Sequence, residues 1–241
     1  MNLPVRFRED MQLLLEADFP DFINALEAPP ATAVRINPFK PVPPPSELEV
    51  PWCSLGYYLK ERPSFTLDPR FHAGTYYVQD ASSMFLEQVF LQTTGNQNSL
   101  RVLDLCAAPG GKSTHLLSML NSNSLLVSNE VIRSRLPLLN TNIEKWGNLN
   151  AIVTCNDPSD FSSLKGFFDV IVVDAPCSGE GLFRKDPDAM TEWSPAHVQM
   201  CGLRQQRIIE NIWPALKEDG VLIYSTCTGN KTENEDNLKW L

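Results

Sequence analysis

The sequence predicts an α/β fold with a Rossmann-like, largely parallel sheet covered by helices on both faces, preceded by a small α+β domain. The second half of the chain alternates between apolar, β-rich segments and helical patterns, which is typical of parallel sheets. The predicted strands cover 101–106, 125–129, 150–155, 168–174 and 220–227. The predicted helices between them cover 112–120, 131–146, 158–165 and 194–213.

The first part of the chain has a different pattern. We expect a helical segment over 2–28, a strand over 32–36, an extended linker over 38–51, irregular chain over 52–80 and a helix over 84–91. The linker holds six of the 19 prolines, which favours extended backbone. We therefore divide the chain into a small N-terminal α+β domain with its linker, 1–66, and a larger domain, 67–241.

Composition limits the classes of function. The chain has 241 residues and a net charge of −9, whereas nucleic-acid proteins usually carry a basic surface. Any contact with RNA phosphates must come from a local basic patch or from something outside this chain. Arg184 with Lys185 is a candidate for such a patch, and an ordinary solvated pair is the alternative. The six cysteines are scattered without C-x-x-C or zinc spacing, so no metal is expected. Without a signal peptide or membrane segment in the pattern, we expect a cytoplasmic protein.

The segment DLCAAPGGKST follows the first strand of the larger domain and opens a helix. Gly110 and Gly111 allow close approach of a ligand, and the free N–H groups of a helix N-terminus bind a carboxylate. The methionine part of S-adenosylmethionine carries such a carboxylate. A tight turn without a ligand is the alternative. A nucleotide-binding P-loop is disfavoured, because it requires glycine where this chain has Cys106.

Acidic residues follow the next three strands of the predicted sheet. Glu130 lies 19 residues after Gly111, where a carboxylate binds ribose hydroxyls, and Asp157 is placed to meet an adenine amino group. Asp174 ends the fourth strand. Each acid alone is typical of a loop or a helix cap. Together with the glycine loop, the four successive strand ends favour a cofactor such as S-adenosylmethionine.

Two cysteines follow the last two strands. Cys177 lies in DAPCSGEG and Cys227 in YSTCTGN. A cysteine near a strand end is often a small buried hydrophobe, but two small-residue turns after adjacent strands favour exposed, reactive thiols. A thiolate that adds to carbon 6 of cytosine makes carbon 5 nucleophilic enough to accept a methyl group. A carboxyl such as Asp174 near ring nitrogen 3 favours that addition.

The segments CAAPGGK, DAPCSGEG and STC, in this order, resemble the Sun/Fmu-type (Nop/Sun) RNA cytosine-5 methyltransferases. PWCSLGYYL and HAGTYYVQDASSM are similar to the bacterial RsmF-like branch, which acts on 16S ribosomal RNA. The resemblance covers about residues 30–241. It implies a class I methyltransferase sheet and an enzyme that methylates carbon 5 of a cytosine in ribosomal RNA or the small ribosomal subunit.

The resemblance also implies roles for individual residues. Cys227 would be the nucleophile and Cys177 would help to release the product, although DNA cytosine methyltransferases attack with the equivalent of Cys177. The family's TCS reads TCT here, Thr226 to Thr228. The implied cofactor-binding residues are Cys106, Ala107, Ala108, Pro109, Gly110, Gly111, Lys112, Glu130, Asp157 and Asp174.

Family members continue beyond the fifth strand, so we expect the C-terminal strands to be missing from this chain. Truncation and acidic charge keep open an alternative, a non-catalytic RNA-binding or ribosome-assembly module on the same fold. The intact Cys177 and Cys227 argue against that alternative.

Overall fold

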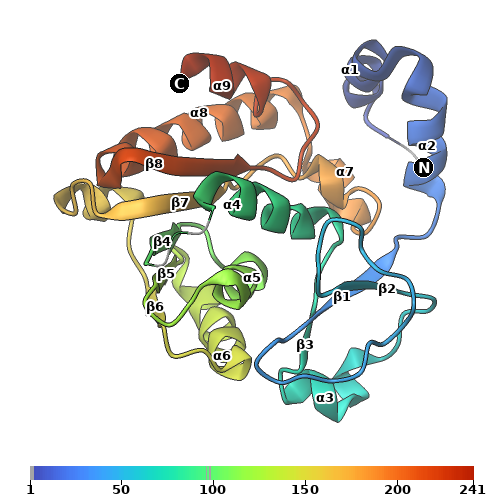
Figure 1. The fold of residues 1–241 in the computed structure, drawn as a ribbon. Helices are drawn as coiled ribbons and strands as arrows, with labels where there is room; N and C mark the ends of the chain where they lie inside the picture. Colours follow the sequence, from blue (N-terminus) through green and yellow to red (C-terminus); the bar gives the residue numbers. More distant parts are fainter. Residues whose placement is uncertain (1–2, 96, 98) are drawn as a thin grey trace. The chain divides into compact units, whose positions relative to one another are not determined.

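The computed structural model describes residues 3–95, 97 and 99–241, so residue 2 of the first predicted helix lies outside the described residues. The chain divides into two compact units (Figure 1). The smaller combines 1–30, 175–211 and 224–241, and the larger combines 31–174 and 212–223. The domain boundary after residue 66 stays a prediction.

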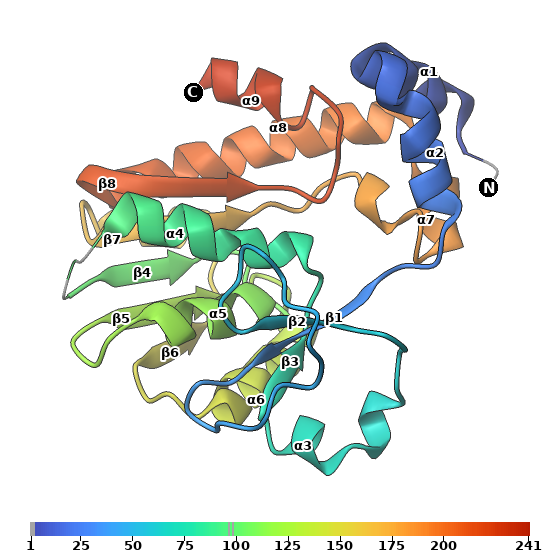
Figure 2. The same ribbon diagram turned by 45° about the vertical axis from the view of Figure 1, so that its right-hand side comes forward.

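A five-stranded sheet in the order β6-β5-β4-β7-β8 belongs to the larger unit, apart from the last two residues of β8. Neighbouring strands run parallel through β6, β5, β4 and β7, which confirms the predicted fold class (Figure 2). The strands are β4 (Arg101–Asp104), β5 (Leu125–Asn129), β6 (Ala151–Thr154), β7 (Phe168–Asp174) and β8 (Leu216–Ser225). Each predicted strand is present, and those over 125–129 and 168–174 have the predicted bounds.

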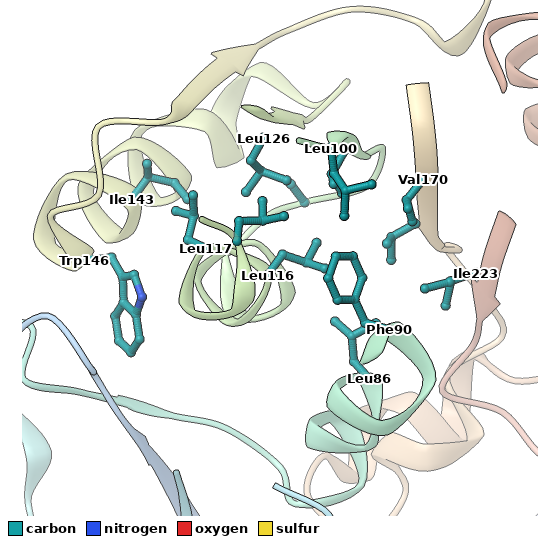
Figure 3. Close-up of a cluster of buried hydrophobic side chains, with 14 of the residues drawn as sticks. Leu86, Phe90, Leu100, Leu116, Leu117, Leu126, Ile143, Trp146, Val170 and Ile223 are labelled. Carbon is teal, nitrogen blue, oxygen red and sulfur yellow. The ribbon is translucent and has the colours of Figure 1, made fainter. Parts of the chain in front are cut away.

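Both faces of this sheet are covered. Successive strand residues point to opposite faces, yet Val102 and Leu103 are both 0% exposed. On one face, α4 (Leu86–Thr94), α5 (Gly111–Met119) and α6 (Leu136–Trp146) pack through apolar residues. Figure 3 shows this core, with Phe90, Leu116, Leu117, Leu126 and Trp146 among its members. Within the larger unit, the sheet therefore supports the loops that follow β4, β5 and β6.

A second, three-stranded sheet has the order β2-β1-β3 and is antiparallel throughout. Its strands are β1 (Thr32–Ile36), β2 (Gly56–Leu59) and β3 (Tyr76–Val78). The predicted strand over 32–36 is confirmed, but the prediction of irregular chain over 52–80 is wrong. Two aromatic-rich strands of only four and three residues lie there, too short to show a period of two, although aromatic residues favour strands.

The smaller unit has its own core. Phe7 and Met11 of α1 (Val5–Leu15) and Phe19 of α2 (Phe19–Glu27) pack with Phe183 and Trp193. The predicted helical segment is therefore two helices, separated by a short 3-10 turn. The remaining helices of the described chain are α3 (Pro69–His72), α7 (Pro187–Glu192), α8 (Pro195–Ile212) and α9 (Glu235–Trp240).

One predicted helix has a different form. Residues 158–165 contain a 3-10 helix, Pro158–Ser163, rather than an α-helix. Among the residues that the structure describes, no helix has the length and apolar character needed to cross a membrane.

Candidate active site

The loop between β4 and α5 adopts a backbone conformation that favours glycine. Gly110 caps α5 with φ of 108°, a left-handed conformation that favours glycine. A Cβ atom there would also lie 3.3 Å from Leu139 Cδ1. The first N–H groups of an α-helix have no partner within the helix, so this end of α5 can bind an anion. The loop fits the carboxylate of an amino-acid-like cofactor.

Neighbouring strands and helices fix this loop. The Ala107 N–H donates to the Asn129 carbonyl at 2.8 Å, and Asn142 Nδ2 donates to the Pro109 carbonyl at 2.8 Å. The Asn129 side chain in turn donates to the carbonyls of Leu105 and Asn156. The ends of β4, β5 and β6 are therefore tied together, and the loop is pre-organised for a ligand.

Glu130 follows β5 and is 2% exposed. Its Oε1 accepts a hydrogen bond from the Ile132 N–H at 2.9 Å, and its Oε2 lies 3.2 Å from Arg135 Nη1. Arg135 Nη2 also donates to the Ala108 carbonyl. A single arginine thus connects the predicted ribose-binding carboxylate with the glycine loop.

The other two predicted acids are also hydrogen-bonded or paired. Asp157 caps the 3-10 helix that follows it, because its Oδ1 accepts a hydrogen bond from the Ser159 N–H at 3.0 Å. Asp174 Oδ2 lies 2.7 Å from Lys112 Nζ, which joins the end of β7 to the first turn of α5. Burial raises the pKa of Cys106 to about 12, so this member of the loop stays a neutral thiol.

Asp104, the last residue of β4, is a candidate that the sequence reasoning missed. It is 0% exposed, and Ser113 Oγ donates to its Oδ2 at 2.6 Å. Its Oδ1 has no hydrogen-bond partner among the described residues. Burial raises the pKa of Asp104 to about 7, with a smaller contribution from Asp174. A buried acceptor beside a ligand loop is suited to a donor on the ligand, such as the amino group of a methionine moiety.

The two predicted cysteines lie side by side within the smaller unit. Cys177 Sγ is 3.0 Å from Cys227 Sγ, and the Cys227 N–H donates to Cys177 Sγ at 3.4 Å. The hydrogen bond from the Cys227 side chain lowers the pKa of Cys177 below its ordinary value, although burial opposes this. Cys177 is half-buried and Cys227 is exposed. The pair offers one acidic thiol and one accessible thiol.

Buried carboxylates hold the two cysteine loops together. Glu180 accepts hydrogen bonds from the Gly229 N–H at 2.8 Å and from Trp193 Nε1 at 3.0 Å. Glu233 accepts from the Ser178 N–H at 3.0 Å and from Gln205 Nε2 at 2.7 Å. Glu180 is 5% exposed and Glu233 is 0% exposed. Neither carboxylate was predicted as a site residue.

Backbone contact between the loops is equally close. The Gly181 N–H donates to the Cys227 carbonyl at 2.7 Å, and a Cβ atom on Gly181 would lie 2.6 Å from that oxygen. A side chain at this position would push the loops apart, which explains why glycine occupies the last position of DAPCSGEG.

Several aromatic and basic side chains that are suited to contact RNA have partners within the chain. Trp52 Nε1 donates to the Ala81 carbonyl at 2.7 Å, Tyr76 Oη donates to Asp68, and Tyr77 packs on the main core. Arg184 Nε donates to the Ala28 carbonyl at 2.8 Å. These contacts support a packing role for the three aromatic residues.

One further polar cluster is buried. His115 Nε2 lies 3.0 Å from Glu87 Oε2, and Cys53 Sγ donates to the same oxygen at 3.2 Å. Burial alone would raise the pKa of Glu87, but hydrogen bonds from His115 and from the Ser54 N–H outweigh it, and the pKa falls to about 2. Burial lowers the pKa of His115 to about 4 and raises that of Cys53 to about 12. This is the donor set of a metal site, but each group also has a hydrogen-bond partner in the cluster.

Both the N-terminal and the C-terminal part of the chain match known protein families. Residues 90–241 match the family model described as 16S rRNA methyltransferase RsmB/F. Residues 3–81 match the model described as the N-terminal domain of 16S rRNA methyltransferase RsmF.

Individual relatives agree with the family models. The ribosomal RNA small subunit methyltransferase F of Pectobacterium carotovorum subsp. carotovorum is 37% identical, over 100% of this chain and 53% of its own length. The protein of the same name from Escherichia coli is 36% identical, over 98% of this chain and 52% of its own. The chain therefore spans about half the length of the curated relatives it matches.

Solved structures share the fold. A methyltransferase homologue from Pyrococcus horikoshii has a TM-score of 0.81 at 28% identity, covering 99% of this chain and 78% of its own. NSun6 from the same organism, determined with SFG, has a TM-score of 0.81 at 19% identity, covering 98% and 86% of the two chains.

Proposed function

Because this chain belongs to the RsmB/F family of 16S rRNA methyltransferases, we propose that it transfers a methyl group from S-adenosylmethionine to carbon 5 of a cytosine in RNA. The observation that carries the proposal is the 3.0 Å separation of Cys177 Sγ and Cys227 Sγ. Two thiols at the ends of neighbouring strands suit a reaction that needs both a nucleophile and a base. The proposed substrate is 16S ribosomal RNA or the small ribosomal subunit, in the cytoplasm.

The residues of the β4–α5 loop fit the proposed cofactor. The N-terminus of α5 suits the methionine carboxylate, and the unpartnered Asp104 Oδ1 suits the amino group. Glu130 is proposed to bind the ribose hydroxyls, and Asp157 the adenine amino group. S-adenosylmethionine, when bound, would supply an electrophilic methyl group on a positively charged sulfur.

Three side chains of the protein, Cys227, Asp174 and Cys177, have proposed roles in the reaction. The Cys227 thiolate forms a bond to carbon 6 of the cytosine. The carboxyl of Asp174, in its protonated form, donates a hydrogen bond to ring nitrogen 3 and so favours the addition. Once carbon 5 carries its new methyl group, Cys177 accepts the proton that carbon 5 loses. The bond between carbon 6 and Cys227 breaks as that proton leaves, which restores the thiolate. The lowered pKa of Cys177 suits a base.

Two variants test the proposal with 16S ribosomal RNA and labelled S-adenosylmethionine. Cys227→Ala should abolish both methyl transfer and any covalent RNA adduct. Cys177→Ala should methylate once and then stall, leaving a protein–RNA adduct stable in a denaturing gel. An adduct that forms in Cys227→Ala and never in Cys177→Ala would reverse the roles.

The alternative, a non-catalytic RNA-binding module, predicts that the unmodified chain binds RNA but transfers no methyl group. The methyltransferase names of the relatives do not favour it. Titration with S-adenosylmethionine separates the two proposals, because only the enzyme requires cofactor binding.

A further inference from the structure

Arg35 of β1 extends from the three-stranded sheet to the helix that follows the cofactor loop. Its Nη2 donates to Thr114 Oγ1 at 2.7 Å and to the Gly111 carbonyl at 3.2 Å. Its Nη1 donates to Ser118 Oγ at 3.2 Å. Arg35 thus binds the first turns of α5 from a strand that lies 76 to 79 residues earlier in the chain.

The guanidinium of Arg35 is buried at considerable cost. Its side chain is 0% exposed, and it lies 4.6 Å above the ring of Trp146. Burial lowers the pKa of Arg35 to about 10, with Cys53, Tyr77 and Glu87 opposing the shift, so the group stays charged at neutral pH. A buried charge is tolerated when its donors are satisfied, and here the acceptors are mainly on α5.

Arg35 also fixes the orientation of a second side chain. Its Nε donates to Gln79 Oε1 at 3.0 Å, which leaves Gln79 Nε2 as a directed donor. Gln79 directly follows β3, and its N–H donates to the Ala33 carbonyl at 3.1 Å, so its backbone is held by the same sheet. The amide orientation therefore follows from Arg35.

Gln79 Nε2 has no hydrogen-bond partner among the described residues, although Gln79 is only 8% exposed. The same amide lies against the cofactor loop, because a Cβ atom built on Gly111 would be 3.8 Å from Gln79 Nε2. A buried donor without a partner is costly unless a ligand supplies the acceptor. Gly111 is the glycine beside which the proposed carboxylate would bind.

We propose that Gln79 binds the methionine carboxylate of S-adenosylmethionine through Nε2, and that Arg35 positions Gln79 and α5 for this contact. The cofactor site then includes the three-stranded sheet as well as the loop after β4. This inference rests on the proposed function, because it requires that S-adenosylmethionine binds this loop.

The test compares S-adenosylmethionine with its decarboxylated analogue by calorimetry. Gln79→Glu keeps an acceptor for Arg35 Nε but replaces the Nε2 donor with a carboxylate oxygen. It should weaken S-adenosylmethionine binding by about tenfold or more, while the analogue without the carboxylate binds as well as before. Gln79→Met, which removes the donor without adding charge, should show the same selectivity.

Arg35→Lys tests the positioning role. It should also weaken S-adenosylmethionine binding selectively, and should speed amide exchange over 111–119. Asn37→Ser is the matched control, since Asn37 lies nearby on the same chain segment, is equally buried and donates to the carbonyls of Gly74 and Trp146 instead of α5.

The outcomes are separable. Equal weakening of both ligands in the Gln79 variants, or no weakening of either, would overturn the inference while leaving the proposed function intact. An unmodified chain that binds neither ligand would instead count against the proposed function itself.

Discussion

Glu180 Oε2 accepts a hydrogen bond from the Gly229 N–H at 2.8 Å, so a buried carboxylate of the first cysteine loop holds the second. Its Oε1 accepts from Trp193 Nε1 and Asn230 Nδ2, both at 3.0 Å. Every one of these partners is a donor. The relative position of the Cys177 and Cys227 thiols therefore depends on the carboxylate of Glu180, which is not itself proposed to react.

Glu180→Gln should destabilise the protein and disturb the thiol pair. The amide would place a donor against existing donors, which costs about 1–3 kcal/mol for a buried group. Urea unfolding measures the loss of stability, and the rate of Cys227 alkylation reports on the loop. Glu192→Gln is the control, because Glu192 is exposed in the same unit. Equal unfolding curves for both variants would show that Glu180 has no such role.

The raised pKa of Asp104 predicts how the free energy of unfolding depends on pH. Its folded pKa of about 7 lies above the ordinary value of 3.8, chiefly because of burial. Between these values the folded chain binds more protons than the unfolded chain, so stability falls as pH rises through the window and levels off above about pH 7.

Asp104→Asn should remove this contribution. Relative to the variant, the unmodified protein should lose up to about 1.4 kcal/mol per pH unit between about pH 4 and pH 7. Denaturant unfolding at a series of pH values measures the difference. Parallel stability curves over this window would contradict the raised pKa of Asp104.

The sequence predicted the large sheet well, for a physical reason. The strands over 125–129 and 168–174 were found with their bounds because buried parallel strands are continuous apolar runs. The proximity of Cys177 and Cys227 could also be predicted, because it requires only that β7 and β8 be neighbours. In both cases the evidence lies within the predicted strands and in the residues that directly follow them.

What the sequence did not predict depends on contacts between distant segments. The strands Gly56–Leu59 and Tyr76–Val78 are stabilised by pairing with β1, rather than by a periodic pattern of their own. Glu180 lies within a segment already singled out, yet its role appears only when Gly229 is seen beside it. Gln79 lies within HAGTYYVQDASSM, but the sequence assigned no role to Gln79 or Arg35, because their contacts join segments that are far apart along the chain.

Glu130 should contribute to cofactor affinity. If it binds the ribose hydroxyls, Glu130→Ala should weaken S-adenosylmethionine binding by about 1–3 kcal/mol, since buried hydroxyl groups would lose their partner. Calorimetry measures the dissociation constant, and Glu144→Gln on the exposed side of α6 is the control. A 2′-deoxy analogue should lose little further affinity in Glu130→Ala. An unchanged dissociation constant would exclude the ribose role.

The thiol pair should be sensitive to oxidation. Cys177 Sγ and Cys227 Sγ lie 3.0 Å apart, and the lowered pKa of Cys177 favours its reactive thiolate form, so the more acidic thiol lies beside its disulfide partner. Diamide takes two electrons and two protons from the pair, so one disulfide should form within the chain. Two of the six cysteines should then become unreactive toward a thiol reagent, and dithiothreitol should restore both.

The exposed Cys155 is the control for this oxidation. Cys155→Ser should lose the same two thiols as the unmodified chain, because Cys155 takes no part in the disulfide. Cys177→Ser should lose none by this route, since it removes the thiol that lies 3.0 Å from Cys227 Sγ. Peptide mapping identifies the linked residues. Retention of all six thiols under diamide, or dimers linked through Cys155, would mean that the pair is not held in the close contact on which the proposed division of labour depends.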